Sequence, residues 1–364
     1  MQPEIFSYNR SFTLESGRTL PSLHLAYTAL GKLNADKSNV VWIFHALTAN
    51  SNPAEWWTGL VGETKLFDPA KYFVICVNMP GSCYGSIGPL DNDPLVEKPY
   101  YHDFPMFTTR DMARAYNLLR KDMGIEKIHI GIGGSMGGHQ LLEWAIEEPE
   151  LFEFIFPIAT NAEHSPWGIA LNASQRMCIE NDATWKEEQV DAGLEGMKIA
   201  RSIALISYRH YEAYSKSQQG FTIETEGARI DKKVFKAESY QRYQGEKLAK
   251  RFNAFCYYFL SQSMDKHNVG RGRDSVRAAL QSIKAKALVI SISSDVLFPT
   301  IEQELLSAYI PNAQLAVIDS YYGHDGFLLE FEAIENLVKD FLKPPSPKGG
   351  YESVVPSSNK FTSK

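Results

Sequence analysis

The sequence predicts an α/β fold in which a mostly parallel sheet is flanked by helices. Short runs of β-branched and aromatic residues alternate with stretches that carry apolar residues at helical spacing. This strand–helix–strand order is typical of crossovers between parallel strands. The composition agrees, because 364 residues with 44% hydrophobic and 22% charged side chains are typical of a soluble globular chain with a large core.

The predicted core elements fall into two blocks. The first block contains the expected strands 38–46, 72–78, 125–132 and 152–160 and the expected helices 109–123 and 139–148. The second contains the expected strands 287–293 and 314–318 and the expected helices 301–308 and 327–342. Residues 1–160 and 274–344 are therefore expected to form one sheet-containing core.

Residues 161–273 separate the two blocks and are predicted to form a helical insertion. Helical patterns occur at 189–208 and 237–264, whereas no pattern of a buried strand occurs there. Residues 345–364 are rich in Pro, Gly, Ser and Lys, a composition typical of a disordered tail. The chain is thus expected to consist of a core, an inserted helical region and a tail.

Charge and cysteine content exclude several classes of protein. The 37 Lys and Arg against 43 Asp and Glu give a formal charge of −6, so nucleic acid is not an expected partner. The four cysteines have neither metal-ligand spacing nor the density of a disulfide framework, so we expect no metal site and a reducing, cytoplasmic location. No export signal and no membrane span are expected, because the first residues lack a basic and then apolar pattern and apolar runs are short.

The sharpest motif is Gly-Gly-Ser-Met-Gly-Gly at 133–138, a G-x-S-x-G pattern between an expected strand and an expected helix. Such a turn is tight and strained, so the neighbouring positions must lack side chains, as glycine does. It would present Ser135 as a nucleophile and leave the backbone N–H of Met136 free to stabilise an oxyanion. A nucleotide-binding loop and a purely structural turn remain alternatives, although Met136 breaks the G-x-G-x-x-G spacing.

A serine nucleophile needs a base and an orienting carboxylate, which such folds supply downstream in the order Ser, Asp, His. Asp295 follows the expected strand 287–293, and His324 follows the expected strand 314–318. Because the carboxyl ends of parallel strands meet at one edge of a sheet, both side chains are expected beside Ser135. Each residue also has an ordinary alternative, a helix cap for the aspartate and a packed side chain for the histidine.

The loop after the strand 38–46 is expected to supply the second oxyanion donor. It reads His45-Ala46-Leu47-Thr48, and the backbone N–H of Leu47 is the best candidate. We interpret His45 as structural, with its ring bonded to loop carbonyl groups.

At this level of detail the sequence resembles the homoserine O-acetyltransferase family, a branch of the α/β-hydrolase fold. The resemblance runs from about residue 5 to 342, and its motifs include HALT (45–48), WWTGL (56–60), GSCYGS (81–86), TRDM (109–112), GSMGG (134–138), YR (208–209), GRGR (270–273), SDVLFP (294–299) and YGHD (322–325). Such collinear agreement is more specific than the serine motif alone, which esterases of the fold share.

The resemblance implies a ping-pong transfer of an acetyl group from acetyl-CoA, as co-substrate, to L-homoserine, without a tightly bound cofactor. It implies that Arg209 binds the carboxylate of the amino acid and that Asp325 binds its ammonium group, while Tyr208 has a less defined role. The helical insertion then acts as a lid against water, and by analogy the protein is expected to be a homodimer. Small molecules, rather than membranes or nucleic acid, are the expected partners.

Three positions depart from the family pattern. Ala49-Asn50 replaces the usual glycine, Ile87 stands where threonine is common, and Ala254 to Tyr257 replaces Ala-Asn-Ser-Tyr. The second and third changes remove polar groups, so succinyl-CoA as donor or L-serine as acceptor stays open. Two rival functions remain, a carboxylester hydrolase with the same triad and a catalytically silent binding protein. An esterase would not need Arg209 and Asp325, and a binding protein would not need the triad.

Overall fold

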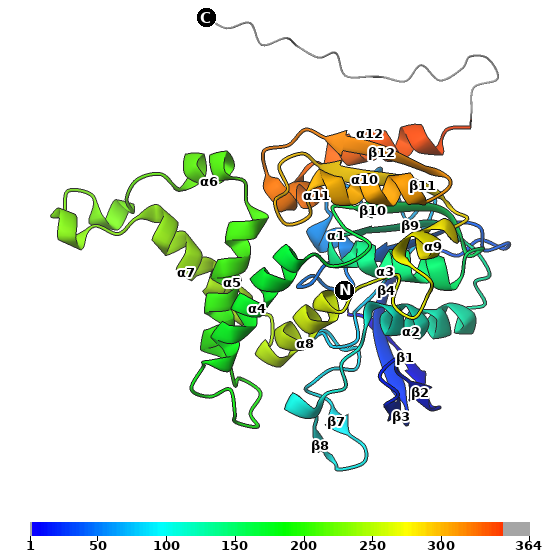
Figure 1. Cartoon of the computed structure of the whole chain (residues 1–364), viewed down its shortest axis with the longest axis horizontal. Helices are drawn as coiled ribbons and strands as arrows, with labels where there is room; N and C mark the ends of the chain where they lie inside the picture. The colour runs from blue at the N-terminus through cyan, green and yellow to red at the C-terminus, as the bar shows by residue number, and fades with distance from the viewer. Residues whose placement is uncertain (1, 345–364) are drawn as a thin grey trace, which may run out of the picture.

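The computed structural model describes residues 2–344 and contains an eight-stranded sheet with the order β1-β4-β6-β5-β9-β10-β11-β12 (Figure 1). The six strands from β6 to β12 pair in parallel, as the sequence predicts, while β1 and β4 add an antiparallel edge. The strands are β1 (Glu4–Tyr8), β4 (Leu23–Leu30), β5 (Val40–Phe44), β6 (Phe73–Val77), β9 (Ile128–Gly134), β10 (Phe152–Ile158), β11 (Lys286–Ile292) and β12 (Ala313–Ile318).

Helices cover both faces of this sheet, which therefore has a core on each side. In β5, Trp42 and Phe44 pack with residues of α2 (Thr109–Asp122) and α3 (Met136–Glu147). The alternate residues Val41 and Ile43 belong to the opposite core, which includes side chains of α12 (Phe331–Leu342). Burial on both faces explains why β5 reads as a continuous apolar run, because neither side of the strand contacts water.

The sequence analysis missed the two antiparallel strands β1 and β4 and misjudged two helices. The expected helix 237–264 is two helices, because Asn253 caps the second one with its side-chain oxygen, which accepts from the Phe255 and Cys256 N–H groups. The expected helix 327–342 is likewise α11 (Gly326–Leu329) followed by α12. Two pairs of two-residue strands lie outside the main sheet: β2 (Phe12–Thr13) with β3 (Thr19–Leu20), and β7 (Asn92–Asp93) with β8 (Lys98–Pro99). The short helices α1 (Pro53–Trp56) and α9 (Val276–Gln281) complete the core.

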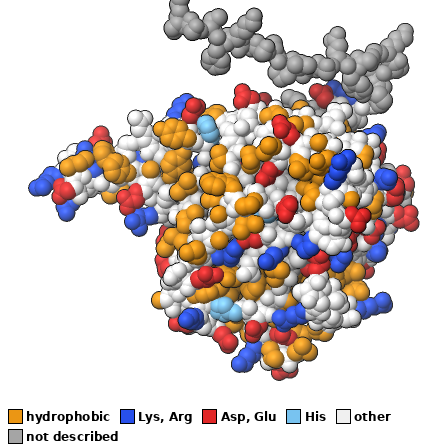
Figure 2. Space-filling model, viewed as in Figure 1, with side chains coloured by type: hydrophobic (Ala, Val, Ile, Leu, Met, Phe, Trp, Pro, Cys, Tyr) orange, Lys and Arg blue, Asp and Glu red, His pale blue; other side chains and the backbone are white. Residues whose placement is uncertain are grey.

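Residues 161–273, between β10 and β11, contain five α-helices that lie beside the sheet (Figure 1). They are α4 (Pro166–Glu180), α5 (Leu194–Tyr208), α6 (Tyr211–Gln218), α7 (Lys236–Ala249) and α8 (Ala254–Asp265). The sequence analysis missed α4, although Ser165 and Pro166 are typical of a helix start. Figure 2 shows the region around α6 and α7 as an arm that projects from the body and carries hydrophobic side chains.

None of the helices in residues 2–344 combines the length and apolar character that crossing a bilayer requires. The expectation of a disordered tail concerns residues 345–364, which lie outside the described residues. The second block of the core completes the sheet with β11 and β12, which are connected by α10 (Thr300–Tyr309).

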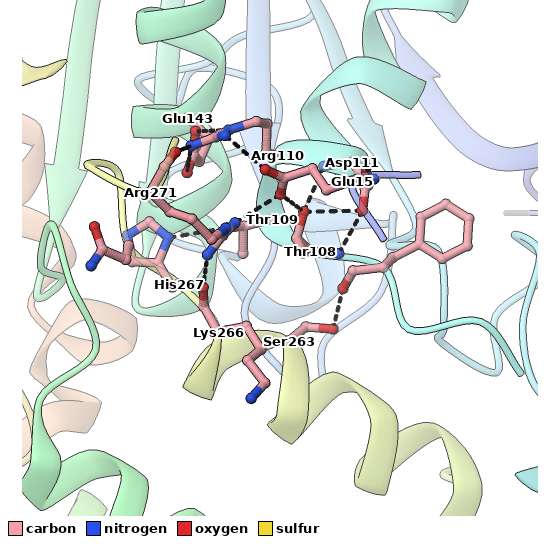
Figure 3. A network of polar contacts seen from close by, with 12 residues as sticks. Glu15, Thr108, Thr109, Arg110, Asp111, Glu143, Ser263, Lys266, His267 and Arg271 are labelled. Carbon is pink, nitrogen blue, oxygen red and sulfur yellow. Dashed lines mark hydrogen bonds and ion pairs between the residues drawn. The ribbon is translucent and has the colours of Figure 1, made fainter. Parts of the chain in front are cut away.

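A buried ionic network joins residues 271–273, which lead from the inserted helices back to the sheet, to the rest of the core (Figure 3). Glu143 of α3 is fully buried and binds Arg110 of α2 at 3.1 Å and Arg273 at 2.9 Å. Glu15 of the amino-terminal segment binds Arg110 and Arg271, each at 2.7 Å. Because every buried charge has an opposite partner, the network avoids the penalty of an isolated ion and ties four distant segments together.

We predict that Glu143→Ala lowers the free energy of unfolding by about 2 kcal/mol or more, because it removes a fully buried carboxylate from between Arg110 and Arg273, which keep only Glu15 and Glu147, respectively, at 2.7 Å. Urea denaturation followed by circular dichroism measures the change. The matched control is Asp340→Ala, which removes the exposed i,i+3 partner of Lys343 and should cost no more than about 0.5 kcal/mol. Equal losses in the two variants would contradict a supporting role for the network.

Candidate active site

Ser135 occupies the turn between β9 and α3. Its φ of +55° and ψ of −127° lie in a region that side-chain-bearing residues rarely adopt, so the turn is strained. A Cβ atom on Gly137 would lie 2.2 Å from the Phe44 carbonyl oxygen, and one on Gly133 would lie 2.7 Å from the Gly137 backbone. The close approach of α3 to β5 thus requires glycine at these positions, as the sequence predicts.

Hydrogen bonds from β10 and the following residues hold the backbone of Ser135 in this turn. The Ser135 N–H donates to the Ile158 carbonyl oxygen at 3.0 Å. The Thr160 hydroxyl donates to the Ser135 carbonyl oxygen at 2.9 Å, and Gln303 in turn donates to the Thr160 carbonyl oxygen. The Ser135 side chain is left to face a cavity of about 430 Å³ that His324 also lines.

Asp295 and His324 lie at the same edge of the sheet, as their positions after β11 and β12 predict. Asp295 Oδ1 accepts from the N–H groups of Leu297 and Phe298 at 2.8 and 2.9 Å, which leaves Oδ2 to bind His324 Nδ1 at 2.6 Å. A carboxylate only accepts hydrogen bonds, so Nδ1 carries a proton, and in the neutral ring Nε2 is the nitrogen that can accept one. This is the tautomer that a general base requires.

Aromatic packing fixes the orientation of the His324 ring. Its neighbours are Phe298 at 5.2 Å, Phe327 at 5.1 Å and Tyr208 at 5.6 Å between ring centroids. The imidazole is almost fully buried, with 3% of its residue surface exposed. The preceding Gly323 has a φ of +69°, and a Cβ atom there would lie 2.8 Å from the Tyr208 carbonyl oxygen. The histidine turn therefore packs directly against the end of α5.

His45 holds the loop that carries Leu47. Burial lowers the pKa of His45 to about 4, so the ring is neutral. Its Nε2 accepts from the Met79 N–H at 3.0 Å, and its Nδ1 consequently donates to the Ala46 carbonyl oxygen at 3.0 Å. The structural interpretation of His45 is confirmed. Leu47 itself lines the cavity that contains Ser135 and His324.

Gln140 links the Leu47 loop to the helix that follows Ser135, and sequence reasoning missed it. Its side-chain amide donates to the carbonyl oxygens of His45 at 3.2 Å and Met136 at 3.0 Å, while Tyr116 donates to its oxygen at 2.7 Å. The two candidate oxyanion donors, the N–H groups of Leu47 and Met136, therefore lie on segments joined by one buried amide. A glutamine one turn into α3 is the only sequence signal for this role.

Arg209 and Asp325 bind each other, with Arg209 Nη1 2.8 Å from Asp325 Oδ2. Burial raises the pKa of Asp325, and the Arg209 charge opposes that effect. Asp325 lines the cavity of Ser135, whereas Arg209 lines an adjoining cavity of about 480 Å³ and also donates to the Tyr240 hydroxyl at 3.3 Å. The sequence analysis placed these two residues at one site but did not anticipate that they pair.

Three further cationic side chains, Arg201, Lys247 and Arg251, line the Ser135 cavity, and sequence reasoning assigned none of them. Arg251 donates to the Thr48 carbonyl oxygen and to the Tyr84 hydroxyl, while Arg201 lies 5.5 Å from the centroid of the Tyr208 ring. Glu55 and Asp325 are the acidic residues of the same lining. Across residues 2–344, no group of three or more His, Cys, Asp or Glu side chains is arranged to hold a metal ion.

Comparison with known proteins places the chain among acyl-transferring and ester-cleaving enzymes. Residues 39–331 match the family described as alpha/beta hydrolase fold. Homoserine O-acetyltransferase of Cyclobacterium marinum is 48% identical, covering 94% of this chain and 95% of that protein. The crystal structure of homoserine O-acetyltransferase from Bacillus anthracis has a TM-score of 0.86 at 25% identity, covering 94% of this chain and 97% of that one.

An acetylester hydrolase from Corynebacterium glutamicum is also similar in structure, with a TM-score of 0.81 at 25% identity, covering 93% of this chain and 95% of that one. The sequence comparison is the more specific, because high identity over nearly the full length of both chains accompanies a single enzyme name. The chain belongs to the homoserine O-acetyltransferase family of the α/β-hydrolase fold.

Proposed function

We propose that this chain transfers the acetyl group of acetyl-CoA to the hydroxyl of L-homoserine through an acyl-Ser135 intermediate, a step toward methionine. The observation that carries the proposal is the 2.6 Å bond between His324 and Asp295 at the wall of the cavity that Ser135 also lines. The 48% identity to a homoserine O-acetyltransferase selects this reaction among those that a serine triad performs.

In the first half-reaction, Ser135 Oγ attacks the thioester carbonyl carbon while His324 Nε2 accepts its proton. Asp295 stabilises the resulting imidazolium and holds it in place through Nδ1–H. The negative charge that develops on the carbonyl oxygen is stabilised by the N–H groups of Leu47 and Met136. Collapse of the intermediate expels the CoA thiolate, which takes the proton from His324, and leaves acetyl-Ser135.

In the second half-reaction, the homoserine hydroxyl attacks acetyl-Ser135 and His324 removes its proton. The bond between the acetyl carbon and Ser135 Oγ then breaks, and Oγ takes the proton back from His324 as the acetylated amino acid leaves. The acceptor is a zwitterion, so it needs one cationic and one anionic partner. Arg209 and Asp325 supply both, and their mutual 2.8 Å bond compensates their charges while the site is empty. When homoserine binds, its carboxylate pairs with Arg209 and its ammonium group pairs with Asp325, in place of the Arg209–Asp325 bond. Each charge therefore keeps an opposite partner.

Water must be restricted if transfer is to exceed hydrolysis of the acyl-serine. We assign this role to residues 161–273, which act as a lid, since α5 supplies Tyr208 and Arg201 to the cavity wall.

We also propose that the enzyme is cytoplasmic and forms a homodimer. The arm around α6 and α7 carries the apolar surface for the second subunit, because Tyr211, Ile223 and Ile230 are exposed by 80%, 83% and 74%.

Variant substrates and one rival reaction define the alternatives. Succinyl-CoA as donor and L-serine as acceptor use the same chemistry at the same residues. A carboxylester hydrolase is the rival, and the structural similarity to an acetylester hydrolase favours testing it. A catalytically silent binding protein is not supported, because it would not need a serine held in a strained turn beside a bonded histidine–aspartate pair.

We predict that Ser135→Ala abolishes acetylation of the protein and lowers kcat by about 10³-fold or more, because the nucleophile is lost. Intact-mass spectrometry after exposure to acetyl-CoA checks for one added acetyl group, and digestion locates it. The matched control is Ser174→Ala, which changes an exposed serine of α4. This variant should keep both the acetylation and the kcat of the unchanged protein. An acetyl group that persists on the Ser135→Ala protein would refute the assignment.

We predict that steady CoA release from acetyl-CoA depends on L-homoserine. The acetyl-Ser135 enzyme reacts onward only with an acceptor that carries both a carboxylate and an ammonium group, so turnover stops without one. Free CoA is followed with a thiol reagent, with and without the amino acid, and the acylated product is identified by chromatography. Parallel reactions with succinyl-CoA and with L-serine compare the alternative substrates. Steady CoA release at the same rate without any amino acid would support the hydrolase instead.

We predict that Arg209→Ala raises the KM for homoserine by about tenfold or more, the expected loss for a hydrogen bond to a charged group. The rate of acetyl-Ser135 formation should stay near that of the unchanged protein, because the donor does not use this side chain. Single-turnover acylation and steady-state kinetics separate the two effects. Arg242→Ala, which alters an exposed arginine of α7 paired with Glu238, is the control. Equal damage to both half-reactions would contradict the role of Arg209.

A further inference from the structure

The cavity of Ser135 has a buried end and an exposed end. Ser135 and His324 belong to the core and are almost fully buried, with 5% and 3% of their residue surface exposed. Lys247 and Arg251 line the same cavity but are exposed, and they belong to residues 161–273. A long ligand whose reactive carbonyl group lies against Ser135 therefore extends toward these two cations.

The guanidinium group of Arg251 is held in place, but only part of it is used. Its Nη1 donates to the Thr48 carbonyl oxygen at 2.5 Å and to the Tyr84 hydroxyl at 2.9 Å. Both acceptors lie on core loops, so these bonds hold the group where the core meets the inserted helices. Within residues 2–344, Arg251 Nε and Nη2 have no hydrogen-bond acceptor and no carboxylate partner. This edge of the guanidinium plane can bind two oxygens of a ligand at once.

Lys247 lies four residues before Arg251, in the last turn of α7, and its charge has no partner. The preceding residue, Glu246, binds Lys198 at 3.0 Å. Lys247 itself forms no ion pair and no side-chain hydrogen bond with any other residue of the described range 2–344. A lysine ammonium group is a compact charge with three donors, which suits a phosphate oxygen. Two cations with free donors thus lie at the exposed end of the cavity.

Positive charge exceeds negative charge in the lining of this cavity. The cations are Arg201, Lys247 and Arg251, and the acidic residues are Glu55 and Asp325. Asp325 is already compensated by its 2.8 Å bond to an arginine of the adjoining cavity. The remaining excess favours a ligand that carries several negative charges. A small neutral ester would make no use of these cations.

We propose that Lys247 and Arg251 bind phosphate groups of the acyl-CoA donor while its thioester lies against Ser135. CoA has the required form, because a flexible pantetheine arm separates the reactive sulfur from a diphosphate and a ribose 3′-phosphate. The inference rests on the proposed acetyl transfer and adds the residues that bind the donor. Homoserine has no phosphate, so the two cations act in the first half-reaction, before the acceptor binds.

The test compares three donors that share the acetyl thioester and differ in their phosphates. They are acetyl-CoA, acetyl-3′-dephospho-CoA and S-acetylpantetheine, which has no phosphate. The rate of acetyl-Ser135 formation at several concentrations gives the half-saturating concentration of each donor. At low salt, Lys247→Ala should raise this value for acetyl-CoA about fivefold relative to S-acetylpantetheine, the upper end for an exposed ion pair.

The dephospho donor separates the two kinds of phosphate. If Lys247 binds the ribose phosphate, Lys247→Ala affects acetyl-CoA but not acetyl-3′-dephospho-CoA, and if it binds the diphosphate, both donors are affected alike. The same comparison applies to Arg251→Gln. Added potassium chloride should raise the half-saturating concentration of acetyl-CoA but not that of S-acetylpantetheine, because salt screens only the charged contacts.

Two further variants serve as controls. Lys250→Ala changes an exposed lysine that lies close to Lys247 in sequence but does not line the cavity, so it should leave the ratio between donors unchanged. Arg251→Lys keeps the charge and loses the planar fork, so its effect should be smaller than that of Arg251→Gln. Using the ratio between donors cancels any disturbance of the Thr48 loop, because such a disturbance affects every donor equally.

An equal rise for acetyl-CoA and S-acetylpantetheine in both Lys247→Ala and Arg251→Gln would overturn the inference. Calorimetric titration of the Ser135→Ala protein with CoA and with pantetheine measures binding without catalysis. Tighter binding of CoA that weakens when Lys247→Ala is added supports the phosphate site, even if no acetyl group reaches homoserine. Acetyl transfer without any preference for donors that carry phosphate would leave the proposed function standing and refute this site.

Discussion

The backbone contact between α3 and β5 is the constraint on which the candidate site depends. Gly137 lies so close to the Phe44 carbonyl oxygen that no side chain fits between them, and Ser135, two residues earlier, has a strained φ of +55°. The same contact brings the loop after β5 beside the start of α3. Gln140 then joins the two segments through their carbonyl oxygens, which leaves backbone N–H groups on both segments available to a developing negative charge.

Behind the site, burial keeps a pair of histidines uncharged so that they can stack. The rings of His139 and His267 lie 3.9 Å apart, and burial lowers the pKa of both, that of His267 to about 3. Two protonated rings at that distance would repel, whereas the neutral rings each donate from Nε2 to Asn161, His139 to its side-chain oxygen and His267 to its backbone carbonyl oxygen. Phe298 contacts both His139 and His324. The packed layer thus helps to hold the His324 ring in place.

The parts of the site that follow from local patterns could be predicted from the sequence, and those that depend on a distant partner could not. The glycines around Ser135 and the order of Asp295 and His324 are local signals, because strand ends in a parallel sheet meet at one edge. By contrast, the pairing of Arg209 with Asp325 joins α5 to a turn near the end of the chain, and no periodicity predicts it. The antiparallel strands β1 and β4 were missed for a similar reason. β1 is largely exposed, and its pairing with β4 determines its structure.

Transfer and hydrolysis place different demands on the groups around a serine, a histidine and a carboxylate. A serine, a histidine and a carboxylate serve both reactions, so the triad does not distinguish them. A neutral ester places no demand on charged groups, whereas a zwitterionic acceptor requires opposite charges held at a fixed distance. In the proposed transfer, the Arg209–Asp325 pair meets that demand at low cost, because each charge compensates the other while the site is empty. Water carries no charges that could pair with Arg209 and Asp325 in this way. In the proposed mechanism, the preference for homoserine over water therefore comes from the charged groups around the triad.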